Sequence, residues 1–253
     1  MRDRINLNAD MGEGYDAADE VLLGIVRTAN VACGAHAGDA RVMRRISELS
    51  VTRGASIGAH PGFEDREHFG RRDMEMTSEQ IEALVAGQIE TIRQIAREAG
   101  TDITHVKAHG ALSNMAAVRE DYASAICRAV KAADPGLIYL ATAGTKMCDA
   151  ARVLGLRLAE EGFADRSYEE DGTLTPRSMA GAVLSDPVKA ARQAVRLAIK
   201  GEVVTRTGKI ISLPVQSLCV HGDEPTAIDV AKTVRAALEA EGLTVAPLTE
   251  MGL

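Results

Sequence analysis

Tryptophan is absent from the sequence, and aromatic residues supply only 3% of its 253 residues. Proteins that bind single-stranded nucleic acid stack bases on aromatic side chains, and nucleic-acid binders in general present a basic face to the phosphates. The formal net charge of −7 points the other way. The composition therefore predicts a protein with no nucleic-acid partner.

Cysteine is scarce, and none of the four cysteines (Cys33, Cys127, Cys148 and Cys219) form a C-x-x-C pair. Zinc-ribbon and thioredoxin-like classes therefore lack support. No run is long enough to span a bilayer, and the first residues lack the apolar core of a signal peptide. We expect no membrane association and a reduced, cytoplasmic protein whose thiols are small buried groups.

The P-loop pattern G-x-x-x-x-G-K and the G-x-S-x-G nucleophile elbow are both missing. A dinucleotide-like match, G-x-G-x-x-A, covers residues 12–17. It is weak, because Glu13 and Asp16 would set acidic groups against a pyrophosphate. If the protein uses ATP, the nucleotide therefore needs another kind of site or another subunit.

Strand-like and helix-like segments alternate along the whole chain, with no linker or repeat between them. Expected strands cover residues 5–10, 56–59, 105–109, 137–141, 156–160, 217–220 and 243–246. Expected helices cover residues 39–53, 77–98, 119–133, 144–154, 186–200 and 226–241, while 21–32 is a helix or a helix plus a strand and 203–213 is a hairpin. This order predicts one parallel α/β domain over residues 1–253, and both a (β/α) barrel and an open doubly wound sheet fit it.

Two helix starts carry capping signals. The Asp39 carboxylate is placed to accept the free N–H groups of a first helical turn. Thr77 and Gln80 form the pattern of a capping box, in which each side chain bonds the backbone of the other residue. Both patterns predict where the following helices begin.

The segment 105–109 places His105, Lys107 and His109 on one face of an expected buried strand, because alternate side chains share a face. A buried ammonium must be paired or have a task. Lys107 is therefore an ion-pair partner for Asp10 or Asp165, or a member of a site. His105 enters the strand early, and we interpret it as a hydrogen-bonded core histidine.

Five strand-like runs end in ionisable side chains, and parallel α/β folds form ligand sites at such ends. These side chains are Asp10 and Glu13, His60, Lys107 and His109, Asp165 and Arg166, and His221 and Asp223. Some have an alternative reading: Asp165 and Arg166 also fit a structural pair, and Arg71 with Arg72 fits either a solvated face or an anion clamp. The shared placement predicts one site.

A metal centre is an open alternative. Asp10, His60 and His221 carry donor groups that suit a metal-dependent hydrolase. No pair of these residues has the helical i,i+4 spacing of common zinc motifs. The sequence therefore leaves the identity of any metal unassigned.

Several long motifs resemble the LamB/YcsF family, in the same order and over nearly the whole chain. They cover residues 6–14 (NLNADMGEG), 29–39, 57–62, 69–72, 106–114, 163–166 and 219–223. Three positions depart from the family pattern, in which a bulkier residue, usually Phe, Pro and Tyr stand where this chain has Ala35, Ala108 and Ser113. These changes predict a wider pocket, or the loss of a stacking or hydroxyl contact.

The resemblance implies a seven-stranded (β/α) barrel of the glycoside hydrolase/deacetylase type, a distorted relative of the TIM barrel. It also implies ATP-dependent opening of the lactam 5-oxo-L-proline (pyroglutamate) to L-glutamate with release of ADP and phosphate. The implied partners are 5-oxoprolinase subunits B and C, and the implied cofactors are ATP, bound by this chain or by a partner, and Mg²⁺. A homo-oligomer is left open.

For that reaction the catalytic candidates are Asp10, His60, Lys107, His109 and His221. The candidates for substrate binding are Glu13, Asn30, His36, Arg71, Arg166 and Asp223. We assign anion binding to Lys107 and Arg166, the base to His109 or Asp10, proton donation or orientation to His60 and His221, and a bond to the ring amide to Asn30. Two other functions remain open: an ATP-independent metal-dependent amide or acetyl hydrolase, and a non-catalytic subunit that binds a small acid.

Overall fold

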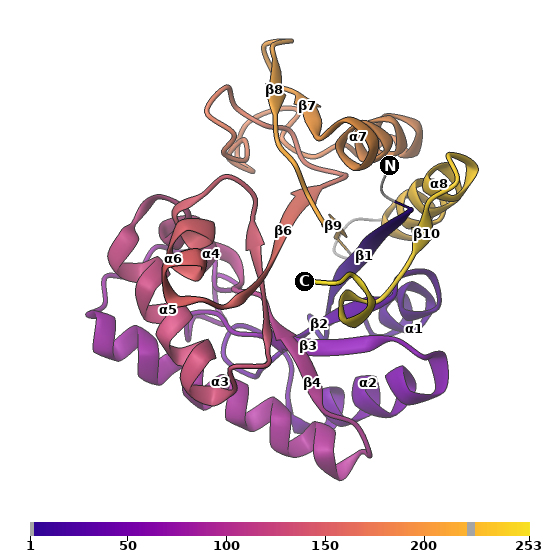
Figure 1. Cartoon of the computed structure of the whole chain (residues 1–253). Coiled ribbons are helices and arrows are strands. Elements are labelled where there is room, and N and C mark those ends of the chain that lie inside the picture. Colours follow the sequence, from indigo (N-terminus) through magenta and orange to yellow (C-terminus); the bar gives the residue numbers. More distant parts are fainter. Residues whose placement is uncertain (1–2, 222–225) are drawn as a thin grey trace.

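The computed structural model describes residues 3–221 and 226–253, and its centre is a closed barrel of seven parallel strands (Figure 1). In barrel order the strands are β1 (Arg4–Met11), β2 (Thr28–Ala32), β3 (Ser56–His60), β4 (Ile103–Val106), β5 (Ile138–Thr142), β6 (Arg157–Phe163) and β9 (Ser217–Val220). β9 closes the barrel by pairing with β1, and a short β10 (Thr244–Val245) pairs with the start of β1. The barrel expected from the family resemblance is confirmed, and the open sheet is excluded.

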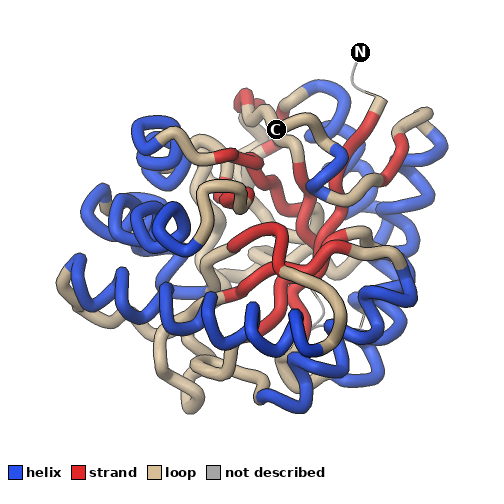
Figure 2. The backbone as a smooth tube through the Cα atoms, turned by 60° about the horizontal axis from the view of Figure 1, so that its bottom comes forward, coloured by secondary structure: helices blue, strands red, loops and turns tan. Residues whose placement is uncertain are grey.

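Helices form an outer layer around the strands (Figure 2). They are α1 (Asp16–Ile25), α2 (Ala40–Arg53), α3 (Ser78–Glu98), α4 (Gly110–Val118), α5 (Glu120–Ala133), α6 (Lys146–Leu154), α7 (Pro187–Lys200), α8 (Ala227–Ala240) and the 3₁₀ turn η1 (Leu248–Glu250). Within the described ranges, none of these helices has both the length and the apolar character needed to cross a membrane.

The predicted helix starts are confirmed. The Asp39 carboxylate accepts a hydrogen bond from the Val42 backbone N–H at 2.8 Å, at the start of α2. Thr77 and Gln80 form both bonds of the capping box that begins α3. These caps satisfy backbone donors that have no partner inside the helix. The hairpin expected at 203–213 is present as the antiparallel pair β7 (Glu202–Val204) and β8 (Ile210–Ser212), which stands away from the barrel beside α7 in Figure 1.

One helix, α4, was not predicted from the sequence. Its segment begins with Gly110, and no side chain caps its first turn, so the usual start signals are missing. Ala111, Leu112, Met115 and Ala116 are buried along it, which indicates that packing stabilises this helix.

The strand expected at 105–109 ends earlier than predicted, at Val106. The chain nevertheless stays bonded to its neighbour: Lys107 N–H donates to the carbonyl of Ala59 at 3.0 Å, and His109 N–H to that of Pro61 at 2.9 Å. This continued pairing keeps His105, Lys107 and His109 on the side that faces the barrel axis.

Part of the barrel interior is polar. Along β1, apolar side chains pack into the main core, while Asn6 and Asn8 point inward and are fully buried. Asn6 donates to Thr28 Oγ1 at 2.7 Å, and Asn8 donates to Glu161 Oε1 and Ser217 Oγ, each at 2.8 Å. Buried polar groups of this kind must be hydrogen-bonded. The network therefore fixes the strands that carry the ionisable side chains at the mouth.

Candidate active site

A cavity of about 590 Å³ opens where the strands end. That volume is typical of a small-molecule site. Of the candidates proposed from the sequence, those that line the cavity are Asp10, Glu13, His60, Arg71, Lys107, His109, Arg166 and His221. Asn30 and His36 are buried behind the wall, and Asp223 lies outside the described residues. Chain segments far apart in sequence thus meet at one place.

Lys107 is the centre of a buried ion-pair network. Its Nζ lies 2.9 Å from Asp10 Oδ1, 3.1 Å from Glu161 Oε1 and 3.1 Å from Cys219 Sγ. Burial favours the neutral amine, but the charge of Asp10 outweighs it and raises the pKa of Lys107 well above its usual value. Of the two partners considered from the sequence, Asp10 is the one the structure pairs with this lysine.

Glu161 was missed by the sequence reasoning, which ended the preceding strand at residue 160. It is 1% exposed at the end of β6 and contacts both Asn8 and Lys107. Burial raises the pKa of its carboxyl. The available signal was a second consecutive glutamate in an otherwise buried strand, because such a charge requires a partner.

Asp10 is held as an ionised carboxylate. Oδ1 accepts hydrogen bonds from Lys107 and from Asn30 Nδ2 (2.8 Å), and Oδ2 lies 3.4 Å from His60 Nε2. Burial opposes ionisation, but His60 and Lys107 hold the pKa of Asp10 well below its usual range. The same contact raises the pKa of His60 despite its burial. A carboxylate beside an imidazole at a cavity wall is suited to moving protons.

Asn30 lies below Asp10 and positions it. Its Nδ2 also donates to Asn8 Oδ1 at 2.7 Å, and its Oδ1 is 2.9 Å from His105 Nε2. Because these bonds occupy the amide, Asn30 orients Asp10, and direct bonding to a substrate stays a prediction. His105 is the expected core histidine: it is fully buried, and burial lowers its pKa to about 3.

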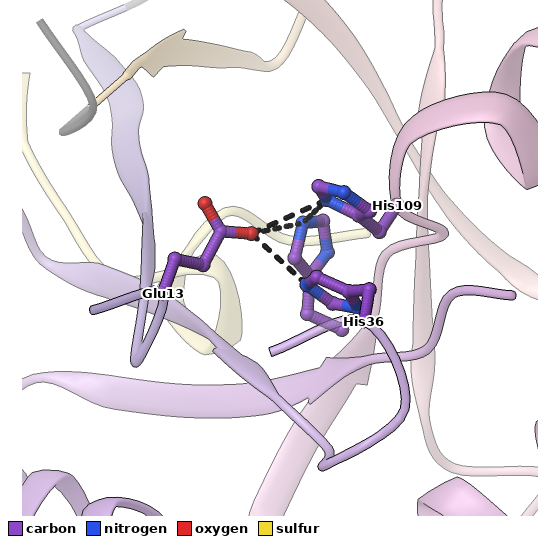
Figure 3. Close-up of side chains that lie close together, drawn as sticks. Glu13, His36 and His109 are labelled. Carbon is purple, nitrogen blue, oxygen red and sulfur yellow. Dashed lines mark hydrogen bonds and ion pairs between the residues drawn. The ribbon is translucent and has the colours of Figure 1, made fainter. Parts of the chain in front are cut away.

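Four ligand-type side chains gather beside Asp10, namely Glu13, His36, His60 and His109 (Figure 3). Glu13 Oε1 lies 3.1 Å from His36 Nε2, 3.2 Å from His109 Nδ1 and 3.8 Å from His60 Nε2. Burial lowers the pKa of both His36 and His109 to about 3. Neutral imidazole and carboxylate are also the groups that bind transition metals.

His221 is oriented by Asp165. The His221 Nδ1 atom lies 2.9 Å from Asp165 Oδ1, and its backbone N–H donates to Oδ2 at 2.8 Å. Burial opposes ionisation of Asp165, but His221 lowers the pKa of this carboxyl. The guanidinium of Arg166 instead donates to the carbonyls of Ala182 and Thr175. Asp165 thus holds an imidazole at the cavity mouth.

Arginine side chains line another part of the wall. Arg71 and Arg166 were candidates from the sequence, whereas Arg177 was not. Burial, with Arg177 nearby, lowers the pKa of Arg166. Guanidinium groups bind carboxylate and phosphate, so this wall suits an anionic ligand. Arg72 faces outward and lies 3.5 Å from Asp65, which fits the solvated alternative for that side chain.

A closed parallel barrel with its ionisable side chains at the strand ends defines an α/β-barrel protein of the glycoside hydrolase/deacetylase type. The model of the LamB/YcsF family matches residues 5–252, and the chain belongs to this family.

Known proteins of similar sequence and structure agree with this assignment. The chain is 47% identical to the 5-oxoprolinase A subunit of Rhodopseudomonas palustris (strain BisB5) over 249 residues, covering 96% of this chain and 98% of that protein. Its fold is similar to the crystal structure of the lactam utilization protein from Thermus thermophilus, with a TM-score of 0.90, 39% identity and coverage of 97% and 100%. A peptidoglycan N-acetylglucosamine deacetylase domain from Eubacterium rectale ATCC 33656 shares the fold alone, at a TM-score of 0.51 and 14% identity over 100% of this chain and 91% of that domain.

Proposed function

We propose that this chain is the A subunit of a 5-oxoprolinase and takes part in the ATP-dependent opening of 5-oxo-L-proline to L-glutamate. The observation that carries the proposal is the ionised Asp10, held between Lys107 and His60 at a cavity with an arginine-lined wall. Relatives support it through a protein named as the A subunit of 5-oxoprolinase, which is 47% identical over nearly the whole chain.

The chemistry explains why ATP is needed. A five-membered lactam is a stable amide that water attacks slowly. Transfer of the γ-phosphoryl group from ATP to the lactam oxygen releases ADP and makes the ring carbon electrophilic. Water then adds to that carbon, the C–N bond breaks with a proton going to nitrogen, and the resulting acyl phosphate takes a second water to give glutamate and phosphate. The site must therefore bind anions, deliver protons and stabilise a tetrahedral intermediate.

The residues divide these tasks by their charge. Arg166, with Arg71, binds the substrate carboxylate or the phosphoryl group. Asp10 accepts a proton from the attacking water, and His60 passes protons to the leaving nitrogen. Lys107 keeps Asp10 ionised, and Asp165 orients His221 for a second proton transfer. The cavity-lining Ala108 and Ser113 leave more room than the larger residues of the family pattern.

ATP and Mg²⁺ enter through partner subunits in this proposal. The chain has no P-loop motif, which agrees with division of the phosphoryl-transfer step between this chain and subunits B and C. We place the reaction in the cytoplasm, where ATP is available and the four buried free cysteines stay reduced.

The test measures glutamate released from 5-oxoproline by this chain alone and together with subunits B and C, each with and without ATP and Mg²⁺. We expect glutamate only from the complete mixture. Asp10→Asn and Lys107→Ala should each reduce its release by at least about 10³-fold, as expected for a group that acts in proton transfer. Lys131→Ala is the matched control, because Lys131 is exposed and bonds only a backbone carbonyl in the described contacts.

Three results would count against the proposal. Normal turnover by both site variants would remove Asp10 and Lys107 from the chemistry. Glutamate formation by this chain without ATP would favour an independent hydrolase. Binding of 5-oxoproline in calorimetry, with no effect of either variant on turnover by the complex, would favour a subunit that only carries the acid.

A further inference from the structure

Backbone carbonyls fix the proton positions on two of the imidazoles beside Glu13. His60 Nδ1 lies 2.8 Å from the carbonyl of Lys107, and His109 Nε2 lies 2.9 Å from the carbonyl of Phe69. A carbonyl oxygen only accepts, so each of these nitrogens carries the proton of its ring. The opposite nitrogens, His60 Nε2 and His109 Nδ1, therefore present lone pairs when the rings are neutral.

These lone pairs converge with a carboxylate. His60 Nε2 and His109 Nδ1 are 3.1 Å apart, and Glu13 Oε1 lies 3.2 Å from the second and 3.8 Å from the first. Three acceptors in a buried position repel one another unless a cation lies among them. A single proton on His60 serves one acceptor at a time, whereas a divalent ion serves all three.

We propose that Glu13, His60 and His109 bind a divalent transition-metal ion, with Zn²⁺ the best fit, at the wall of the cavity. A tetrahedral zinc shell with bonds of about 2.0–2.1 Å separates its donor atoms by about 3.3 Å. The three measured separations, 3.1, 3.2 and 3.8 Å, lie around that value. All three residues line the cavity, so a fourth position is open to water or substrate.

His36 belongs to the support of this site and is not one of its ligands. Its ring stacks on that of His109 at 3.7 Å with an angle of 4° between the planes, so the in-plane lone pairs of the two rings run parallel and cannot meet at one ion. The rings of His60 and His109 are nearly perpendicular, at 83°, which allows their lone pairs to meet. His36 Nε2 instead donates to Glu13 Oε1, seen among the dashed contacts in Figure 3, and orients the carboxylate.

The surroundings match those of metal-binding histidines, whose second nitrogen characteristically donates to a carbonyl or carboxylate. Two glycines make room for the rings. A Cβ at Gly70 would lie 2.8 Å from His36 Cβ and 3.1 Å from His109 Cδ2, and a Cβ at Gly62 would lie 2.8 Å from His36 Nδ1. The imidazoles are thus held in place by close backbone packing.

The experiment uses the full chain, stripped with a chelator and titrated with Co²⁺ as a spectroscopic probe and with Zn²⁺. We expect one ion per chain, the visible absorption bands of low-coordinate Co²⁺, and a higher Tm with metal. Glu13→Gln and His109→Asn should lose the bands and the bound ion. His36→Asn should keep the stoichiometry and weaken affinity by about 10–100-fold, as for other residues that orient a ligand.

His68→Asn is the matched control, because His68 is an exposed histidine that bonds Asp65. It should bind metal as the unaltered chain does. The metal-free variants are first compared by circular dichroism and Tm, so that a folding defect is recognised. X-ray absorption at the zinc edge of the unaltered chain gives a second readout that needs no variant, and it should show only nitrogen and oxygen neighbours.

Several outcomes would overturn the inference. They are absence of stoichiometric Co²⁺ or Zn²⁺ at micromolar concentrations, unchanged binding by folded Glu13→Gln and His109→Asn, or a sulfur neighbour in the zinc spectrum. The last would place the ion at the neighbouring group of Asp10, Cys219 and His221. None of these measurements requires turnover, so they test the metal site separately from the proposed function.

Discussion

Replacing Lys107 by methionine should destabilise the protein in a pH-dependent way. The ammonium is 5% exposed and lies within 3.1 Å of two buried carboxylates, those of Asp10 and Glu161. Methionine fills similar space but leaves both carboxylates without their cation. Removing one partner of a buried ion pair costs about 3–5 kcal/mol, and we expect a loss of this size in the free energy of unfolding near pH 8.

The sign of the pH dependence follows from the carboxyl pKa values. In the unaltered chain the pKa of Asp10 is depressed, so its contribution to stability is present above the unfolded pKa of about 4 and is lost as the pH falls. In Lys107→Met the folded-state pKa values of Asp10 and Glu161 rise above the unfolded ones, so the variant loses stability as the pH rises. The difference between the two proteins should therefore shrink between pH 8 and pH 5.

Urea unfolding followed by circular dichroism at pH 5 and pH 8 measures both quantities, provided that the slope with denaturant is unchanged. Adding Glu161→Gln to Lys107→Met should recover about 1–2 kcal/mol, because one uncompensated carboxylate is removed. The exposed Lys131→Met should change stability by less than about 0.5 kcal/mol. A loss below about 1 kcal/mol at pH 8, or an equal loss at both pH values, would refute the reasoning.

Two further predictions concern stability. Burial raises the pKa of Asp19 to about 6, so ionisation of this acid opposes folding and the unaltered chain should lose stability as the pH rises from about 4 to 6. Asp19→Asn should remove that slope and be more stable by roughly 1–3 kcal/mol at pH 7.5, and an unchanged slope would contradict the assignment. A Cβ at Gly58 would lie 2.4 Å from the ring of His105 and 2.5 Å from its carbonyl oxygen, so Gly58→Ala should cost about 2–3 kcal/mol or more. Gly87→Ala, at an exposed position of α3 with nothing within 4 Å of the new Cβ, should instead gain about 0.5–1 kcal/mol, and equal thermal shifts for the two would show that crowding is not the cause.

Much of the site followed from local pattern. Alternation along β1 separates the outward apolar side chains from the inward Asn6, Asn8 and Asp10, and it can be read from the sequence alone. The placement of ionisable residues at strand ends brought together eight cavity-lining candidates, because parallel strands deliver their C-terminal ends to one mouth. The capping residues Asp39 and Thr77 marked helix starts, since a cap acts within a few residues.

The rest depended on contacts between segments distant in sequence. Glu161 and Arg177 carry no local motif, and only the closed barrel places the first beside Lys107 and the second at the cavity wall. Helix α4 lacks start signals and is stabilised by burial of one face, which only tertiary packing provides.

The sequence by itself therefore determined the alternating strands and helices, the inward face of β1 and the set of ionisable groups at the mouth. Only the tertiary structure decided between a closed barrel and an open sheet, through the pairing of β9 with β1. It also decided which nitrogen of His60 and of His109 faces Glu13, because carbonyls from other segments take the opposite nitrogen. Periodicity records which face a side chain takes, whereas ring orientation and charge pairing depend on what lies across the barrel.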